Sequence, residues 1–359
     1  MTPERPDGDG LDIVPQEWFI YRGTGQPLSD GSLRTALPSP PPWRNFDGGP
    51  LQQPPAEDLD ELARRLGPAD PARTRRAINH DEVVAVNAAL FLRRPLLVSG
   101  PPGVGKSTLA YQISRELRLG PVLRWPINSR VTLRSGIYDY DAIARVHEAR
   151  RREATQGSTA ETDIGDYVQL GPLGTALLPY ELPRMLLIDE FDKSDPDLAN
   201  DLLDVLEEGA YEITELARIR AQHPEVRVHT TDPGRDAVIH GGSLRCRAFP
   251  FIVITSNGER EFPPAFLRRC VRLEMPEPTP ERLADLITAH FSGTAEPYMQ
   301  ELIQEFLNYR RWQTMAADQL LNVLYLAMQK PEERFDPGDR SWRQVMDTVL
   351  QRLDAAGPV

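Results

Sequence analysis

The chain has 359 residues, which is enough for two or three domains whose hydrophobic core is stable without disulfide bonds or metal ions. Its 53 Asp and Glu residues outnumber its 41 Lys and Arg residues, and the net charge of −12 argues against a protein that wraps nucleic acid through bulk charge. Two cysteines are too few for a disulfide framework, the N-terminus does not resemble a signal peptide, and no stretch approaches the roughly 18 apolar residues of a membrane span. We therefore expect a cytoplasmic protein with no membrane span, for which nucleic acid is a poor partner.

Residues 1–57 have the composition of an extended arm. The first 60 residues contain 11 prolines and 7 glycines, a share at which a segment does not build its own core. The same segment nevertheless carries the aromatic residues Trp18, Phe19, Tyr21, Trp43 and Phe46. A purely solvated linker does not need these rings, so we expect the arm to dock through them, on this protein or on another. A free linker is the alternative.

Apolar segments alternate with amphipathic segments from residue 58 to residue 274. Short apolar runs, typical of buried parallel strands, occur at residues 95–99, 122–125, 185–188 and 251–255, with helical patterns between them. This alternation predicts an α/β fold in which a doubly wound parallel sheet is covered by helices on both faces. From residue 275 to residue 359 the strand signals stop while amphipathic segments continue, which predicts a second, all-helical domain.

The segment GPPGVGKS at residues 100–107 matches the phosphate-loop pattern G-x-x-x-x-G-K-[ST] and lies between a predicted strand and a predicted helix. Its glycines allow successive N–H groups to point at phosphate oxygens, while the helix that follows presents its positive end. Lys106 would reach the β and γ phosphates, and the Ser107 hydroxyl would ligate Mg²⁺. The predicted nucleotide-binding residues are Gly100, Pro101, Pro102, Gly103, Val104, Gly105, Lys106, Ser107 and Thr108.

Polar residues follow two of the predicted strands. Asp189 and Glu190 follow the apolar run MLLI, and Asn257 lies just beyond the run FIVIT. Because ligands of parallel α/β sheets bind at the carboxyl ends of strands, Asp189 would lie beside the phosphate loop and hold Mg²⁺ together with Ser107. Glu190 would then polarise the attacking water as a general base, and the Asn257 amide would hold the water and the γ-phosphate. A solvated acidic strand end and a turn asparagine are the alternatives.

Two arginines, Arg268 and Arg269, lie beyond this predicted site in the segment PPAFLRRC. They follow a short helical turn and are badly placed to serve their own nucleotide. They are better placed to serve the nucleotide of a neighbouring subunit, as an arginine finger supplied in trans. A surface pair at a helix end is the alternative.

Taken in order, these motifs resemble an AAA+ ATPase, and within that superfamily the chain is similar to the MoxR-like branch. The resemblance rests on the segments RPLLVSGPPGVGKSTLA, QLGPLGTALLP, LLIDEFDKSDPDLANDLLDVLEEG and ITSNGEREFPPAFLRRC. It implies a P-loop core, a C-terminal helical lid and an insert within residues 141–180. Its functional residues map onto Lys106 and Ser107 (Walker A), Asp189 and Glu190 (Walker B), Asn257 (sensor 1) and Arg269, the preferred finger.

The resemblance also implies an activity and partners. Such a protein would hydrolyse ATP with Mg²⁺, form a homo-oligomeric ring, a hexamer by family resemblance, and act as a chaperone-like remodeller of a client protein. The aromatic-rich leader and the PPPWR segment are similar to those of MoxR-type ATPases encoded beside von Willebrand factor A proteins. A protein with that domain is therefore the expected client.

The predicted lid departs from the family pattern. The stretch QTMAADQLL has no sensor 2 arginine at the expected place, and Arg310 and Arg311 lie just upstream, as substitutes or as surface residues. A slow nucleotide-dependent switch or scaffold in a bacterial signalling or defence system is therefore the alternative function. A nucleic-acid motor is disfavoured by the acidic pI, and a small-molecule kinase needs neither the arginine pair nor the lid. Tyr138 and Tyr140 lie where AAA+ rings place pore loops, but we expect them to pack in the core.

Overall fold

The computed structural model describes residues 18–67, 79–156, 163–276, 322 and 325. The predicted arm is therefore described from residue 18 onward. Most of the predicted helical lid, including Arg310 and Arg311, lies outside the described residues. Among the helices that are described, none combines the length and the apolar character needed to cross a bilayer.

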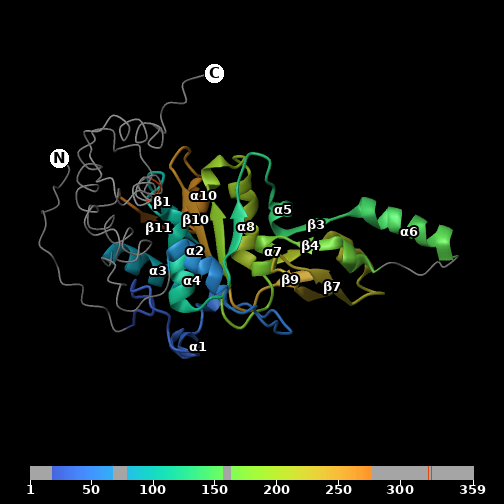
Figure 1. Cartoon of the computed structure of the whole chain (residues 1–359), viewed down its shortest axis with the longest axis horizontal. Helices are drawn as coiled ribbons and strands as arrows, with labels where there is room; N and C mark the ends of the chain where they lie inside the picture. Colours follow the sequence, from blue (N-terminus) through green and yellow to red (C-terminus); the bar gives the residue numbers. More distant parts are fainter. Residues whose placement is uncertain (1–17, 68–78, 157–162, 277–321, 323–324, 326–359) are drawn as a thin grey trace, which may run out of the picture.

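A parallel sheet of five strands forms the centre of the molecule (Figure 1). Across the sheet the strands are β11 (Val271–Glu274), β1 (Leu96–Ser99), β10 (Phe251–Ser256), β5 (Met185–Asp189) and β2 (Leu123–Pro126), and all neighbouring pairs are parallel. The four predicted strands and their parallel arrangement are thus confirmed. The sequence does not predict β11, because VRLE alternates apolar and charged residues instead of forming an apolar run.

Helices cover both faces of this sheet. On β5, Met185 and Leu187 belong to one cluster of buried residues, whereas Leu186 and Ile188 belong to another. The first cluster includes residues of α2 (Leu59–Leu66), α3 (His80–Leu92) and α4 (Lys106–Leu117), and the second includes residues of α7 (Pro172–Ala176), α8 (Leu198–Glu208) and α10 (Pro264–Leu267). The predicted doubly covered sheet is therefore confirmed.

A second sheet of six short strands is not predicted by the sequence. In order across the sheet, its strands are β3 (Tyr138–Tyr140), β4 (Val168–Leu170), β7 (Glu225–His229), β8 (Asp236–His240), β9 (Ser243–Arg245) and β6 (Ala210–Glu212). Several of these strands bury only alternate residues and give no apolar run to recognise. As we expected, Tyr138 is buried in the core and Tyr140 packs against it.

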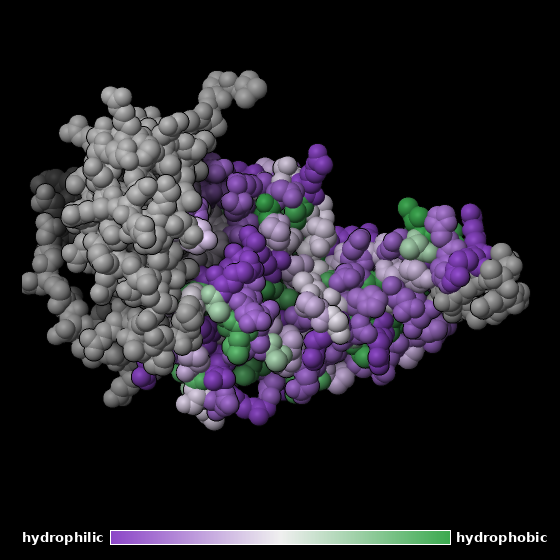
Figure 2. All heavy atoms as spheres, in the orientation of Figure 1, coloured by the Kyte–Doolittle hydropathy of each residue, from purple (hydrophilic) through white to green (hydrophobic). Residues whose placement is uncertain are grey.

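The helix α6 (Ala142–Gln156) connects β3 to β4 and extends away from the body of the molecule (Figure 1). It lies in the region where the family resemblance places an insert. In Figure 2 this protruding part is mostly hydrophilic with one small hydrophobic patch, and two hydrophobic residues of α6, Ile143 and Val146, are 73% and 50% exposed. The remaining short helices are α1 (Ser32–Ala36), α5 (Leu133–Ile137), α9 (Thr214–Ile219), η1 (Pro42–Arg44), η2 (Ile164–Tyr167) and η3 (Phe191–Lys193).

The N-terminal arm docks on the α/β core of its own chain. Phe19 and Tyr21 are buried in the cluster that contains α3 and α4. Asn87 of α3 accepts hydrogen bonds from the backbone N–H groups of Ile20 and Tyr21, at 2.9 and 3.1 Å. Glu116 of α4 accepts further hydrogen bonds from the backbone of Arg22, Gly23 and Gly25. Docking, rather than a free linker, is therefore confirmed for the described part of the arm.

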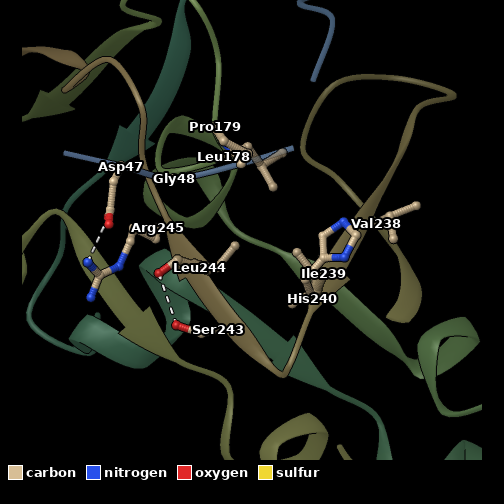
Figure 3. Close-up of a pocket in the computed structure, with 11 residues that line it drawn as sticks. Asp47, Gly48, Leu178, Pro179, Val238, Ile239, His240, Ser243, Leu244 and Arg245 are labelled. Carbon is tan, nitrogen blue, oxygen red and sulfur yellow. Dashed lines mark hydrogen bonds and ion pairs between the residues drawn. The ribbon is translucent and has the colours of Figure 1, made fainter. Parts of the chain in front are cut away.

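Farther along, the arm runs beside the second sheet. A pocket of about 270 Å³ lies between the arm at Asp47 and Gly48 and the strands β8 and β9 (Figure 3). Arg245 of β9 donates a hydrogen bond to Asp47 at 2.9 Å. A Cβ atom on Gly48 would overlap the backbone oxygen of Arg245, so this close approach requires glycine.

Candidate functional site

The turn between β1 and α4 has the backbone conformation that its glycines predict. Gly100, Gly103 and Gly105 have φ angles of 151°, 76° and 91°, which favour glycine. A Cβ atom on Gly100 would also overlap the backbone oxygen of Met275. The rest of the loop is less constrained. Pro102 is exposed, Pro101 and Thr108 are half-buried, and Val104 is buried against the core.

Lys106, the first residue of α4, connects the loop to the end of another strand. Its Nζ donates hydrogen bonds to the carbonyls of Gly100 and Pro101, each at 2.7 Å, and to Oδ1 of Asn257 at 2.8 Å. Burial lowers the pKa of the Lys106 ammonium, and the carboxylates of Asp192, Asp189 and Glu190 oppose this shift. The predicted loop lysine and the predicted strand-end asparagine are therefore in direct contact.

Asp189, the last residue of β5, is the centre of a second set of contacts. Its Oδ1 accepts hydrogen bonds from the hydroxyls of Ser107, at 2.5 Å, and Thr255, at 2.9 Å. Its Oδ2 accepts one from the guanidinium of Arg124, at 2.8 Å. Burial raises the pKa of Asp189, but the hydrogen bonds from these three side chains outweigh it and hold the pKa below its ordinary value. The carboxylate is therefore kept ionised.

Glu190 follows Asp189 in an unusual backbone conformation. Its φ of 61° and ψ of 48° lie in the left-handed region, which a residue with a Cβ adopts only when its surroundings hold it there. Its N–H donates to the Thr255 hydroxyl at 2.8 Å, and its carboxylate pairs with Lys193 at 3.0 Å. That pair is about half exposed, and the hydrogen bond raises the pKa of Lys193.

The buried carboxylate of Asp192 fixes the backbone at Asn257. Oδ2 of Asp192 accepts hydrogen bonds from the backbone N–H groups of Asn257, at 2.8 Å, and Glu259, at 3.2 Å. Oδ1 of Asp192 is buried and has no hydrogen-bond partner among the described residues. Asp192 thus fixes the loop after β10, and with it the position of the Asn257 amide beside Lys106.

The two predicted finger arginines are not part of this cluster. Arg269 donates from Nε to the carboxylate of Glu207 at 3.1 Å and from Nη1 to the carbonyl of Ala265 at 3.2 Å. The Arg268 side chain is exposed and has no hydrogen-bond or ion-pair partner among the described residues. Neither arginine makes a hydrogen bond to the described phosphate loop of its own chain.

The groups at this edge of the sheet fit a nucleotide with a bound cation. The glycine turn, the Lys106 ammonium and the start of α4 are the groups that hold phosphates. Ser107 and Asp189 supply the hydroxyl and carboxylate oxygens that Mg²⁺ prefers. Within the described ranges there is no group of three or more His, Cys, Asp or Glu side chains that could hold a metal. A cation here would therefore take further ligands from the nucleotide phosphates and water.

Three residues of the site are not predicted from the sequence. Arg124 interrupts an otherwise apolar strand, which is a signal that could have been read. Thr255 ends the apolar run of β10, and Asp192 stands behind the acidic pair. Each of the three reaches partners far away in the sequence, so their roles become visible only in the folded chain.

The strand order defines the class of protein. β10 lies between β1, which leads into the phosphate loop, and β5, which ends in Asp189. Lys106, Asp189 and Asn257 therefore meet at the carboxyl ends of three neighbouring strands. This arrangement is the core of an AAA+ P-loop fold.

The comparison with protein families agrees with this class. Residues 95–270 match the family described as AAA domain, dynein-related subfamily. The match spans the phosphate loop, the acidic end of β5, Asn257 and both arginines of the pair. Residues 95–270 are therefore similar to an AAA domain.

The comparisons with individual proteins are more distant. A solved structure of NtrX from Brucella abortus in complex with ADP matches with 13% identity and a TM-score of 0.36, over 82% of this chain and 55% of that chain. This chain thus spans about half of the length of the NtrX chain. No curated protein gives a significant sequence match.

Proposed function

We propose that this chain is an ATP-hydrolysing AAA+ protein of the MoxR type that acts as a chaperone-like remodeller of a partner protein. The proposal depends on one observation, the contacts that join the phosphate loop to both strand ends. Lys106 reaches Asn257 at 2.8 Å, and Ser107 reaches Asp189 at 2.5 Å. Groups from three strands thus converge on the volume that a triphosphate would need for attack by water.

In this proposal residues 100–108 bind the phosphates, through backbone N–H groups of the loop and the first turn of α4. Lys106 exchanges the carbonyls of Gly100 and Pro101 for the β and γ phosphates. Ser107 and Asp189 hold Mg²⁺, which when bound neutralises charge on the phosphates. The low pKa of Asp189 supports this role, because a metal ligand has to be ionised.

Glu190 is the proposed general base. Its carboxylate is half exposed at the strand end, next to the residue that would hold the metal, and it would take the proton of the attacking water. The Asn257 amide would orient that water, while Asp192 holds its backbone in place. Glu190 would have to leave Lys193 to act, so the Lys193 contact restrains the base in the resting protein.

The arginine pair supports assembly into a ring, for which we propose six subunits. Arg268 and Arg269 lie at the surface and make no hydrogen bond to the phosphate loop of their own chain. In a ring, one of them would reach the γ-phosphate of a neighbouring subunit as a finger. The sequence favours Arg269 as the finger, although Arg268 is the one whose guanidinium makes no hydrogen bond or ion pair among the described residues. The Arg269 contacts with Glu207 and Ala265 use Nε and Nη1, which leaves Nη2 without a hydrogen bond among the described residues and able to reach a neighbour's phosphate.

The proposed client is a protein, specifically one with a von Willebrand factor A domain. Hydrolysis would change the angle between the α/β domain and a helical lid and so do mechanical work on this client. Cys246 and Cys270 are free and buried, which supports a reducing compartment, and we propose the cytoplasm.

One observation favours the second candidate, a slow nucleotide-dependent switch. Lys193 and Glu190 form an ion pair at 3.0 Å, so the proposed base is engaged before any nucleotide arrives. If that contact persisted in the nucleotide complex, the protein would bind ATP and hydrolyse it slowly. Lys193→Ala would then raise the rate of hydrolysis, whereas for a remodeller with a freely moving base the rate would stay near that of the wild type.

The deciding experiment compares ATP hydrolysis and ATP-analogue binding in the wild type and in Glu190→Gln. We expect Glu190→Gln to keep binding and to lose hydrolysis by about 100-fold or more. The matched control, Glu212→Gln, changes an exposed carboxylate of β6 and should behave as the wild type does. Equally slow hydrolysis in all three proteins would reject the ATPase in favour of the switch. For the client, Glu190→Gln held in ATP should retain a purified von Willebrand factor A protein that the nucleotide-free form releases.

A further inference from the structure

The described part of the arm inserts a single arginine into the core. Arg44 belongs to η1, in the PPPWR segment, and is only 5% exposed. Its guanidinium lies over the Phe249 ring at 4.4 Å. Its hydrogen bonds go to backbone carbonyls of α8 and of the end of α3. A buried guanidinium is costly unless its donors are used, so this side chain is committed to those carbonyls.

Through α8, Arg44 is connected to Arg269. Nη1 of Arg44 donates to the carbonyls of Leu206, at 2.7 Å, and Glu207, at 3.1 Å. These carbonyls belong to the last turn of α8, where the helix offers them no N–H partner and a cation is favoured. The carboxylate of Glu207 in turn accepts the hydrogen bond from Nε of Arg269. The residue that caps α8 therefore also fixes the carboxylate that holds Arg269.

Through the end of α3, Arg44 is connected to Arg268. Nε and Nη2 of Arg44 donate to the carbonyl of Arg93, at 3.2 and 2.7 Å. Arg93 is the C-cap of α3 and has a left-handed backbone, with φ at 53°. The next residue, Arg94, donates from Nη1 to the carbonyl of Arg268 at 2.9 Å. Both members of the arginine pair are thus tied to backbone that Arg44 holds.

The charges of this region make the position of Glu207 important. Burial lowers the pKa of the Arg44 guanidinium, Arg94 and Arg269 lower it further, and the Glu207 carboxylate raises it. The guanidinium groups of Arg94 and Arg269 are therefore close enough to repel that of Arg44, and the Glu207 carboxylate offsets this repulsion. If the end of α8 moved, Arg269 would lose its fixed counter-charge among like charges.

From these contacts we propose that Arg44 is a positioning residue, and that docking of the arm holds Arg268 and Arg269 in the orientation that completes a neighbour's nucleotide site. This inference rests on the proposed role of the pair in trans. It adds that a subunit with a displaced arm keeps its own phosphate loop and its own base but fails to complete the site next to it.

The test is complementation of ATP hydrolysis between two defective full-length proteins. Arg44→Met should bind an ATP analogue as the wild type does and lose hydrolysis by about tenfold to 100-fold, because the finger is misplaced and not removed. Glu190→Gln lacks the base but keeps its arm and its arginine pair. In a mixture, an Arg44→Met subunit next to a Glu190→Gln subunit has an intact base and a well-placed finger. The mixture should therefore hydrolyse ATP faster than the two proteins measured separately.

Two more variants keep this test decisive. Glu207→Gln removes the carboxylate through which Arg44 is connected to Arg269. Because Glu207 is half exposed, this variant tests the inference even if Arg44→Met does not fold. It should also lose hydrolysis and be rescued by Glu190→Gln. Arg34→Gln is the matched control, because Arg34 is an exposed arginine of the arm that pairs with Glu181, and it should hydrolyse ATP as the wild type does.

The outcomes separate this inference from the proposed function. If Arg268→Ala and Arg269→Ala both hydrolyse ATP at the wild-type rate, the finger role of the pair fails and the inference falls with it. If one of them is inactive and is rescued by Glu190→Gln, the finger role stands. In that case two results would overturn the positioning role of Arg44 alone. One is that Arg44→Met and Glu207→Gln hydrolyse ATP at the wild-type rate, and the other is that they lose hydrolysis and Glu190→Gln does not restore it.

Discussion

Asp189, at the end of β5, and Glu116, in the last turn of α4, are both buried carboxylates that accept several hydrogen bonds. Their pKa values nevertheless shift in opposite directions. The pKa of Asp189 is lowered, because hydrogen bonds from Ser107, Arg124 and Thr255 outweigh its burial. The pKa of Glu116 is raised, because burial outweighs its hydrogen bonds from the backbone N–H groups and the threonine hydroxyl of residues 22–25.

One difference between the two regions is a guanidinium that donates a hydrogen bond directly to the carboxylate. Arg124 lies 2.8 Å from Asp189, whereas the donors to Glu116 are uncharged groups of the arm. A carboxylate that has to receive a cation needs its charge, and a neighbouring cation preserves that charge in a buried place. A carboxylate that only holds a backbone segment does not need it. Asp189 thus has the electrostatics of a ligand site, whereas Glu116 has those of a structural contact.

The largest expected effect comes from Lys106→Ala, which acts on the first region only. Removing the ammonium should weaken binding of an ATP analogue by about 100-fold, since a hydrogen bond to a charged group contributes up to about 3 kcal/mol. The arm should stay docked, because Glu116 and its partners are untouched. Fluorescence titration measures the binding, and limited proteolysis of residues 18–57 measures the docking. Unchanged binding would remove the phosphate loop from the proposed site.

The first region was largely predictable because its motifs are local. The glycines and Lys106 lie within eight residues, and Asp189 ends an apolar run that predicts a buried strand. Their partners were not predictable in the same way. Arg124 and Asp192 reach Asp189 and Asn257 across 65 residues of sequence, and a single sequence does not reveal such pairs.

The arm shows the same limit. The aromatic residues correctly predict that it docks, and Phe19 and Tyr21 are buried. Trp18 packs against Phe91 of α3 but stays 48% exposed, and the argument fails for Trp43, which is 71% exposed while its neighbour in sequence, Arg44, is buried. Hydrophobicity predicts which residue types favour the core, but a buried arginine depends on carbonyls that only the folded chain supplies.

A smaller effect is expected on stability, and it has opposite pH trends in the two regions. Because its folded-state pKa is depressed, Asp189 stabilises the fold above the unfolded-state pKa of about 4, and this contribution is lost as the pH falls through the folded-state value. Asp189→Asn should lower the free energy of unfolding by about 1–3 kcal/mol at pH 7. The difference from the wild type should shrink as the pH falls.

Glu116→Gln is the counterpart of that variant. Because the folded-state pKa of Glu116 is raised, its contribution is complete below the unfolded-state pKa and is lost as the pH rises through the folded-state value. The difference between the wild type and Glu116→Gln should therefore shrink as the pH rises. Urea titrations of all three proteins from about pH 2 to about pH 7 measure both trends, that of Asp189 below its unfolded-state pKa and that of Glu116 above its own. Trends in the same direction would contradict the contrast between the two carboxylates.

The smallest effect tests the guanidinium itself. The Arg124 side chain is 46% exposed, so its ion pair with Asp189 contributes up to about 1 kcal/mol, the equivalent of about fivefold in an equilibrium constant. In Arg124→Gln, Mg²⁺ no longer competes with this cation for Asp189. The Mg²⁺ concentration needed for half-maximal binding of an ATP analogue should therefore fall by up to about fivefold.

The matched control is Arg134→Gln, because Arg134 is also a half-exposed arginine paired with a carboxylate, that of Glu215 at 2.7 Å. Its Mg²⁺ requirement should equal that of the wild type. A higher Mg²⁺ requirement in Arg124→Gln would mean that the guanidinium helps to hold the phosphates and does not compete with the metal. Arg124 would then belong with Lys106 among the nucleotide-binding residues.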